Sequence, residues 1–177
     1  MNSLFFRKKL DVNEASLLIA NFVSMQDGPT VDGWIIDVSK ELNINSDYIK
    51  NEVLYLKASV GYMFITERYG NTTYWSKPIG FKFIGTYIEI MKYMHSGKYM
   101  FDDFFKQRCV EYSATVHGDY GSGGTLFSKD GLDKMTKQFV KYLSDEGSAY
   151  GMVLGFTVPA TLCKALLDIF SGVTIKV

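Results

Sequence analysis

This chain of 177 residues has few cysteines, no net charge and no long apolar run. Its two cysteines, Cys109 and Cys163, form no CxxC pair, so the spacing of a metal site is missing and we expect both side chains to be small and buried. Nineteen basic side chains are balanced by nineteen acidic ones, so the basic excess of a typical nucleic-acid-binding chain is absent. We predict neither a metal ion nor a cofactor.

The longest stretch without a charged side chain, residues 147–163, has 17 residues and is interrupted by Gly151, Gly155 and Pro159. About 18 consecutive apolar residues indicate a membrane span, so this stretch falls short. Residues 1–11 place their basic side chains after the apolar ones, the reverse of a secretory leader. We therefore expect a cytoplasmic protein that has no membrane partner.

Hydrophobic residues make up 47% of the chain, which is enough for a substantial core. Apolar side chains at helical spacing predict helices over residues 12–25, 32–42 and 46–60. Asp11 and Glu14 have the spacing of a capping box at the first helix. Asn43 suits a left-handed cap after the second helix, and Gly61 is expected to end the third.

After Gly61 the pattern changes from helical to alternating. Residues 62–66 and 72–75 are rich in β-forming side chains and flank a turn at Gly70 and Asn71, which predicts an antiparallel hairpin over residues 62–75. Ser76 and Pro78 then open a helix that runs to Met94. Its apolar stripe is wide, so we expect it to contact a second subunit or the C-terminal half.

Ser96 and Gly97 mark the best internal boundary, which divides the chain into an N-terminal domain (residues 1–96) and a C-terminal domain (residues 97–177). The predicted fold is mainly α with a small β-hairpin, followed by a helical, or α+β, second half. Apolar spacing in that half indicates helices over residues 101–112, 132–147 and 159–172. Residues 110–116 fit a strand as well, and residues 150–158 fit either a strand or a helix.

Residues 117–125 are rich in glycine and predict a loop. Their glycine spacing resembles a phosphate-binding loop, but Gly124 stands where that motif has its lysine. His117 is close to Asp119 in sequence, yet two residues of separation need a special turn to form a catalytic pair, and we expect an exposed loop histidine. A small enzyme that uses this loop is a third hypothesis, and the prediction is that the chain is not an enzyme.

Residues 31–83 resemble the winged helix-turn-helix superfamily. The resemblance rests on a small residue where two helices cross, apolar neighbours, a tight turn and a capped second helix; these are Ser39, Val38, Leu42, Asn43, Ile44, Ser46 and Ile49. Residues 74–81 are also similar to the join between wing and helix in regulators of the MarR and PadR kind. Glu52 departs from the pattern, which usually has an apolar residue at that position.

The resemblance implies a homodimeric transcriptional regulator that binds double-stranded DNA, with its second helix in the major groove and its hairpin against the backbone or the minor groove. The implied DNA-binding residues are Ser46, Tyr48, Lys50, Asn51 and Lys57 on the helix, and Arg68, Asn71 and Lys77 at the wing. Residues 1–96 contain ten basic and ten acidic side chains, however, and Asp47 and Glu52 would repel phosphate. The alternative is an interaction or scaffold module that binds a protein partner instead of DNA.

Overall fold

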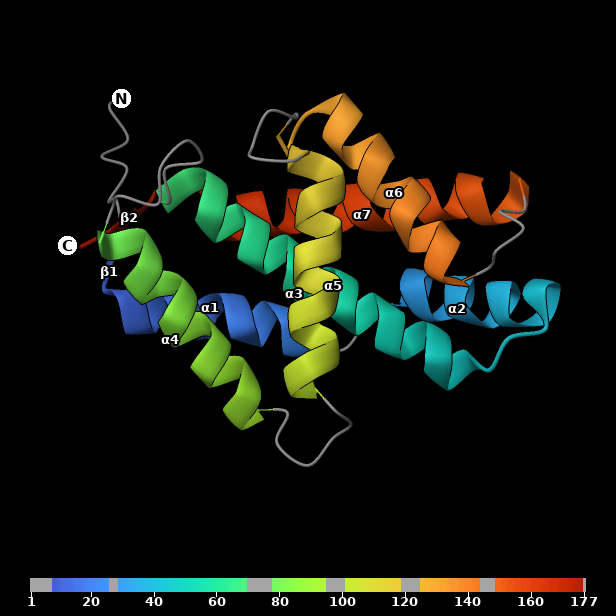
Figure 1. The fold of residues 1–177 in the computed structure, drawn as a ribbon, viewed down its shortest axis with the longest axis horizontal. Helices are drawn as coiled ribbons and strands as arrows, with labels where there is room; N and C mark the ends of the chain where they lie inside the picture. The colour runs from blue at the N-terminus through green and yellow to red at the C-terminus, as the bar shows by residue number, and fades with distance from the viewer. Residues whose placement is uncertain are drawn as a thin grey trace, which may run out of the picture.

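The computed structural model describes residues 8–25, 29–69, 78–94, 101–118, 125–143 and 149–176. Within these ranges the chain forms seven helices and two short strands (Figure 1). The elements are β1 (Lys8–Leu10), α1 (Val12–Ser24), α2 (Pro29–Leu42), α3 (Ser46–Tyr69), α4 (Pro78–Met94), α5 (Phe101–His117), α6 (Lys129–Leu143), α7 (Ala149–Ile169) and β2 (Val173–Ile175). The expectation of a mainly helical protein is confirmed.

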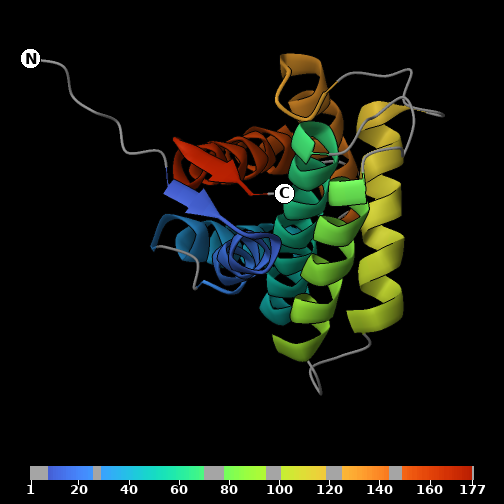
Figure 2. The same ribbon diagram turned by 90° about the vertical axis from the view of Figure 1, so that its left-hand side faces the viewer.

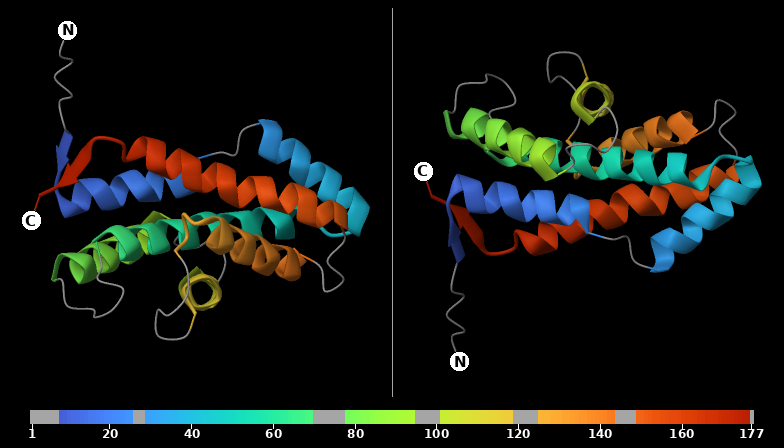
Figure 3. Two further views of the ribbon diagram at one scale, coloured as in Figure 1. Left: turned by 90° about the horizontal axis from the view of Figure 1, so that it is seen from above. Right: turned by 90° about the horizontal axis from the view of Figure 1, so that it is seen from below.

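Helix α3 is the centre of the molecule, because it contacts α1, α2, α4, α5, α6 and α7. Figure 3 shows α1, α2 and α7 in one layer and α3, α4 and α6 in the next, with α5 crossing the outer side of that second layer. A helix enclosed in this way must be apolar around most of its circumference. Residues 56–61 and 63–65 of α3 are accordingly all buried.

The predicted hairpin is wrong in its first strand, because residues 62–66 continue α3. Their β propensity is outweighed by packing: the side chains of Met63, Phe64 and Ile65 are completely buried in the helical conformation. Residues 70–77, which carry the expected turn and second strand, lie outside the described residues. The wing therefore cannot form as an antiparallel hairpin over residues 62–75.

Gly61 does not end the third helix, as was expected, but lies within it. A Cβ atom at Gly61 would lie 2.7 Å from Cγ2 of Ile19 on α1 and 2.9 Å from the hydroxyl of Tyr87 on α4. Both distances are too short for a real Cβ contact, so the glycine allows three helices to approach closely. The residue that suggested a helix end is instead required by tertiary packing.

The turn between α2 and α3 agrees with the sequence. Asn43 has φ 52°, the left-handed conformation predicted for it. The amide of Ile44 donates to the carbonyl oxygen of Ser39 (3.1 Å), and the Ser39 hydroxyl donates to the carbonyl oxygen of Ile44 (2.7 Å). The capping box is confirmed too, since Asp11 and Glu14 exchange hydrogen bonds of 2.8 Å at the start of α1.

Strands β1 and β2 pair in parallel, with Leu10 opposite Ile175 (Figure 2). The amide of Lys176 also donates to the carbonyl oxygen of Leu10 over 2.7 Å. This small sheet joins the two ends of the described chain. The two sides of the expected boundary near residue 97 also share one hydrophobic core, and the division into two domains stays a prediction.

The second half has no strand where one was considered. Residues 110–116 belong to α5, and residues 150–158 belong to α7, which contains Pro159 in its interior. His117 is the last residue of α5 and is partly buried, so the expectation of an exposed loop histidine is wrong. Cys109 and Cys163 are free and buried, as expected. Burial raises the pKa of each thiol to about 12, which keeps both protonated at neutral pH.

Candidate functional site

The DNA-binding residues expected on α3 do not share one exposed face. Tyr48 and Lys50 are exposed in its first turn, whereas Ser46 and Asn51 are half-buried. The Tyr48 hydroxyl donates to the carbonyl oxygen of Tyr142 over 2.7 Å, and Lys50 forms a 3.5 Å ion pair with Asp47. The start of α3 thus offers a short polar surface only.

Lys57 is buried, with 4% of its surface exposed, and its Nζ donates to the carbonyl oxygen of Met25 over 2.8 Å. The prediction that Lys57 lies on an exposed reading face is therefore wrong. Arg68 is exposed, with its guanidinium 5.7 Å from the centroid of the Phe64 ring. Asn71 and Lys77 lie outside the described residues. The described basic residues of the expected set, Lys50, Lys57 and Arg68, include one that is buried, so these three do not form one exposed basic face.

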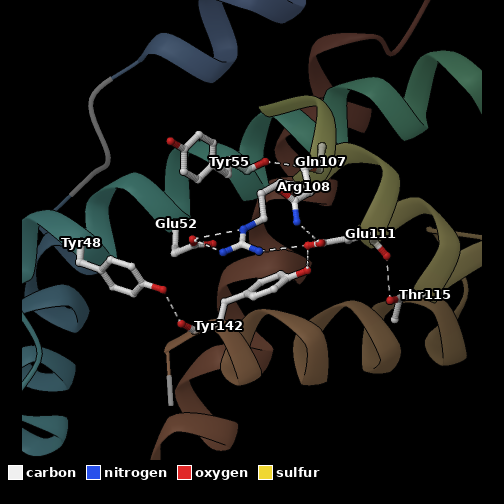
Figure 4. Close-up of polar contacts among 9 residues, drawn as sticks. Tyr48, Glu52, Tyr55, Gln107, Arg108, Glu111, Thr115 and Tyr142 are labelled. Carbon is white, nitrogen blue, oxygen red and sulfur yellow. Dashed lines mark hydrogen bonds and ion pairs between the residues drawn. The ribbon is translucent and has the colours of Figure 1, made fainter. Parts of the chain in front are cut away.

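A buried ion pair explains why Glu52 departs from the helix-turn-helix pattern. Its carboxylate oxygen Oε1 accepts hydrogen bonds from Nη2 (2.9 Å) and Nε (3.3 Å) of Arg108 on α5. Arg108 also donates to Glu111 over 3.0 Å, and its guanidinium carbon lies 3.5 Å from the centroid of the Tyr142 ring. Figure 4 shows Arg108 enclosed by these three side chains, which come from α3, α5 and α6.

The pKa values within this network follow from burial and pairing. Burial raises the pKa of Glu52, although the hydrogen bond and the charge of Arg108 oppose the shift. Burial also raises the pKa of Glu111, but hydrogen bonds from Tyr142, Gln107 and Arg108 outweigh it and leave this pKa below its usual value. Burial and the hydrogen bond to Glu111 raise the pKa of Tyr142 to about 12. The network thus holds a charged arginine between two glutamates.

A second polar cluster lies farther along the same two helices. Nε2 of His117 lies 2.6 Å from Oε1 of Glu67 on α3, and Nδ1 of His117 lies 3.0 Å from the hydroxyl of Ser113. Oε1 of Glu67 also accepts a 2.5 Å hydrogen bond from the amide of Leu126, which precedes α6. The side chains of Glu67 and His117 are 8% and 12% exposed, so the cluster is largely shielded from water.

An open apolar depression lies on the surface of α4, beside α1. We call it the α1–α4 groove; its volume is about 710 Å³ and it is lined by Leu17, Gly85, Thr86, Glu89, Ile90, Tyr93 and Met94. Leu17, Tyr93 and Met94 are exposed large hydrophobic side chains. The groove lies on α4, the helix whose wide apolar stripe predicted more than one contact. Part of that stripe contacts α1 and α3, and the remainder lines the groove.

A metal centre and a membrane span are both missing from the described residues. Among the described residues, no group of three or more histidine, cysteine or acidic side chains is placed to hold a metal ion. None of the described helices combines the length and the apolar character needed to cross a bilayer. Comparisons with protein-family models, with curated proteins and with solved structures found no match to this chain.

Sequence reasoning missed both polar clusters for the same reason. Arg108 and His117 are separated from their glutamate partners by 56 and 50 residues, and no local pattern links them. The spacing of four residues between Ser113 and His117 was the one available signal, because such side chains face each other on a helix. That spacing acquires meaning only when residues 110–117 are helical.

Proposed function

We propose that this protein is an interaction module that binds an amphipathic helix of a partner protein in the α1–α4 groove. The observation that carries the proposal is the exposure of Tyr93, which keeps 82% of its surface exposed beside Met94 at 36%. Contiguous exposed apolar side chains mark binding surfaces. Tyrosine and methionine are also enriched at protein interfaces.

The form of the groove suits a helix. It runs along α4, with Leu17 of α1 at its side, and a volume of about 710 Å³ accommodates several apolar side chains. A partner helix would place side chains at positions i, i+3, i+4 and i+7 into such a groove. Gly85 is exposed in the lining and leaves space there, since a Cβ atom would meet nothing within 4 Å.

The polar residues near the groove favour a defined orientation of the partner. Glu89 and Lys92 form a 3.4 Å ion pair on α4, and the Glu89 side chain is 75% exposed. Charged groups beside an apolar centre contribute more to specificity and association rate than to affinity. The combination of an apolar groove and a charged border is typical of protein interfaces.

The alternative of a DNA-binding regulator remains a prediction with less support. Non-specific DNA affinity depends on basic charge that can reach phosphates. The chain has no net charge, and Lys57 is buried. A homodimer also remains a prediction, and in that case a helix from a second copy would occupy the groove.

The test is a selection of helical peptides from a displayed library, with affinities then measured by fluorescence anisotropy. Filling the groove with Gly85→Leu should lower the affinity by about tenfold or more, because the apolar anchors lose their space. Gly33→Leu is the matched control, since Gly33 also has nothing within 4 Å of an added Cβ atom and lies on α2. Tyr93→Ala should weaken binding without changing the helical circular dichroism.

The proposal would be contradicted if the selected peptides bound Gly85→Leu with the same affinity as wild type, or if the selection returned no binding peptide. Light scattering of the protein alone tests the homodimer, which Gly85→Leu should then dissociate. A gel shift with random duplexes at two salt concentrations tests the DNA alternative. Binding that is strong at low salt and lost at high salt would favour a regulator.

A further inference from the structure

Ser113 can be compared with the other serine and threonine hydroxyl groups of the described helices. Five of them donate to the carbonyl oxygen four residues earlier in their own helix, as is common for buried serine and threonine. These residues are Ser16, Ser59, Thr66, Thr115 and Thr136. The Ser113 hydroxyl instead lies 3.0 Å from Nδ1 of His117. It is therefore paired with a base and not with the backbone.

The proton positions in this cluster follow from one backbone amide. The amide of Leu126 can only donate, so Oε1 of Glu67 accepts from it over 2.5 Å. The same oxygen lies 2.6 Å from Nε2 of His117, which places the proton of a neutral imidazole on Nε2. Nδ1 is then an acceptor, and the hydroxyl of Ser113 is the donor.

We propose that Ser113 is the nucleophile of an acyl-transfer site that acts on carboxylic esters with a small acyl group. In this site His117 is the general base, and Glu67 is the positioning residue that holds His117 in the required tautomer. A nucleophile within hydrogen-bond reach of a base, with the base oriented by a third group, is the arrangement that activates serine. The acyl group is small because Ser113 is half-buried.

The reaction balances without any further reagent except water. The Ser113 oxygen forms a bond to the acyl carbon while its proton moves to Nδ1 of His117. The ester C–O bond breaks, and the leaving alkoxide takes that proton and departs as an alcohol. Water then attacks the acyl-serine with His117 as its base, which releases the carboxylic acid and restores Ser113.

The first experiment exposes the full chain to a fluorophosphonate probe and locates the adduct by mass spectrometry. Wild type should carry the adduct on Ser113, and Ser113→Ala should carry none. Thr115→Ala is the matched control, since Thr115 lies on the same helix and its hydroxyl donates to the Glu111 carbonyl oxygen. A wild type that stays unlabelled, or a label that persists in Ser113→Ala, would overturn the proposal.

The second experiment measures hydrolysis of p-nitrophenyl acetate by the same variants. Ser113→Ala and His117→Gln should each lower kcat by about 100-fold or more, the usual contribution of a general base. Glu67→Gln keeps an oxygen that can accept from both Leu126 and Nε2 of His117, but it removes the negative charge that stabilises the protonated imidazole formed in each step. It should therefore lower kcat, leave KM unchanged and leave the melting temperature near that of wild type. Turnover equal to wild type in all three variants would show that the cluster is only structural.

Discussion

Helix α3 carries two glutamates, Glu52 and Glu67, and each is paired with a basic side chain on α5. Glu52 faces Arg108, which also contacts Glu111 and lies against the ring of Tyr142. Glu67 faces His117, whose other ring nitrogen meets a serine hydroxyl. Both pairs join α3 to α5, and their side chains are similarly buried, but the basic residue is arginine in one pair and histidine in the other.

The difference shows how the choice of base decides what a buried pair can do. Arginine stays protonated in proteins and offers donors only, so the Glu52 pair can hold the helices together but cannot accept a proton. A neutral histidine has one donor and one acceptor nitrogen, and the acceptor nitrogen can take up a proton. The Glu67 pair therefore has the chemistry of a proton-transfer site.

The largest expected effect is on the arginine pair. Arg108→Ala leaves Glu52 without its partner, with 3% of its side chain exposed, and should lower the free energy of unfolding by about 3–5 kcal/mol. His117→Gln should cost less, about 1–3 kcal/mol, since Glu67 keeps a hydrogen bond from the amide of Leu126. Denaturation in urea measures both variants. Equal losses in the free energy of unfolding would contradict the view that the Arg108 pair is structural and the His117 pair serves proton transfer.

A double substitution sharpens this result. Replacing both charges, with Arg108→Met and Glu52→Leu together, should recover most of the stability that Arg108→Ala loses. The reason is that a buried ion pair adds little to the free energy of unfolding compared with a well-packed apolar pair of similar size. A double variant that is as unstable as Arg108→Ala would show that the remaining contacts of Arg108, with Glu111 and Tyr142, carry the stability.

The comparison between the Glu52 and Glu67 pairs requires that α3 is continuous between the two glutamates. Substitutions at Gly61, which lies between them, test this continuity. Gly61→Ala should lower the free energy of unfolding by about 1–3 kcal/mol, because the new methyl group would press on Ile19 and Tyr87. Gly85→Ala should instead be neutral or raise stability by up to about 1 kcal/mol, since its Cβ is unobstructed and alanine favours a helix. Backbone chemical shifts of residues 62–66 give an independent measurement, and shifts typical of a strand would contradict the helix.

The smallest expected effect concerns Tyr142, whose hydroxyl donates to Glu111. Tyr142→Phe should cost about 1 kcal/mol at neutral pH. The pKa of Glu111 is lowered in the folded protein, so its contribution is present above the unfolded value near 4.5 and is lost as the pH falls through the folded pKa. The gap between the variant and wild type should therefore shrink on acidification, and thermal unfolding at several pH values measures it. A gap that grows at acid pH would contradict this account.

Several features of the first half could be predicted because their causes are local. The capping box of Asp11 and Glu14 and the left-handed Asn43 depend on residues at most five positions apart. The burial of Ile49 and Val53 follows from helical spacing. Ile44, one of the residues that carry the helix-turn-helix resemblance, packs against the core but is only partly buried.

Errors arose where local preference and packing disagree. Residues 62–66 prefer a strand, yet their burial against neighbouring helices keeps them in α3. Gly61 has the sequence properties of a helix end, but its lack of a Cβ atom serves a close approach of helices. Lys57 has the spacing of an exposed residue and is buried, because its ammonium group reaches the backbone of Met25.

The sequence by itself determined that this protein is mainly helical, where several of its helices begin and turn, and that its cysteines are buried. Those properties depend on hydrophobic periodicity and on hydrogen bonds between near neighbours. Only the tertiary structure decided which base meets Glu52 and which meets Glu67, and that Leu17 and Tyr93 line one groove. Such contacts join residues about 50 or more positions apart, and they depend on how whole helices cross.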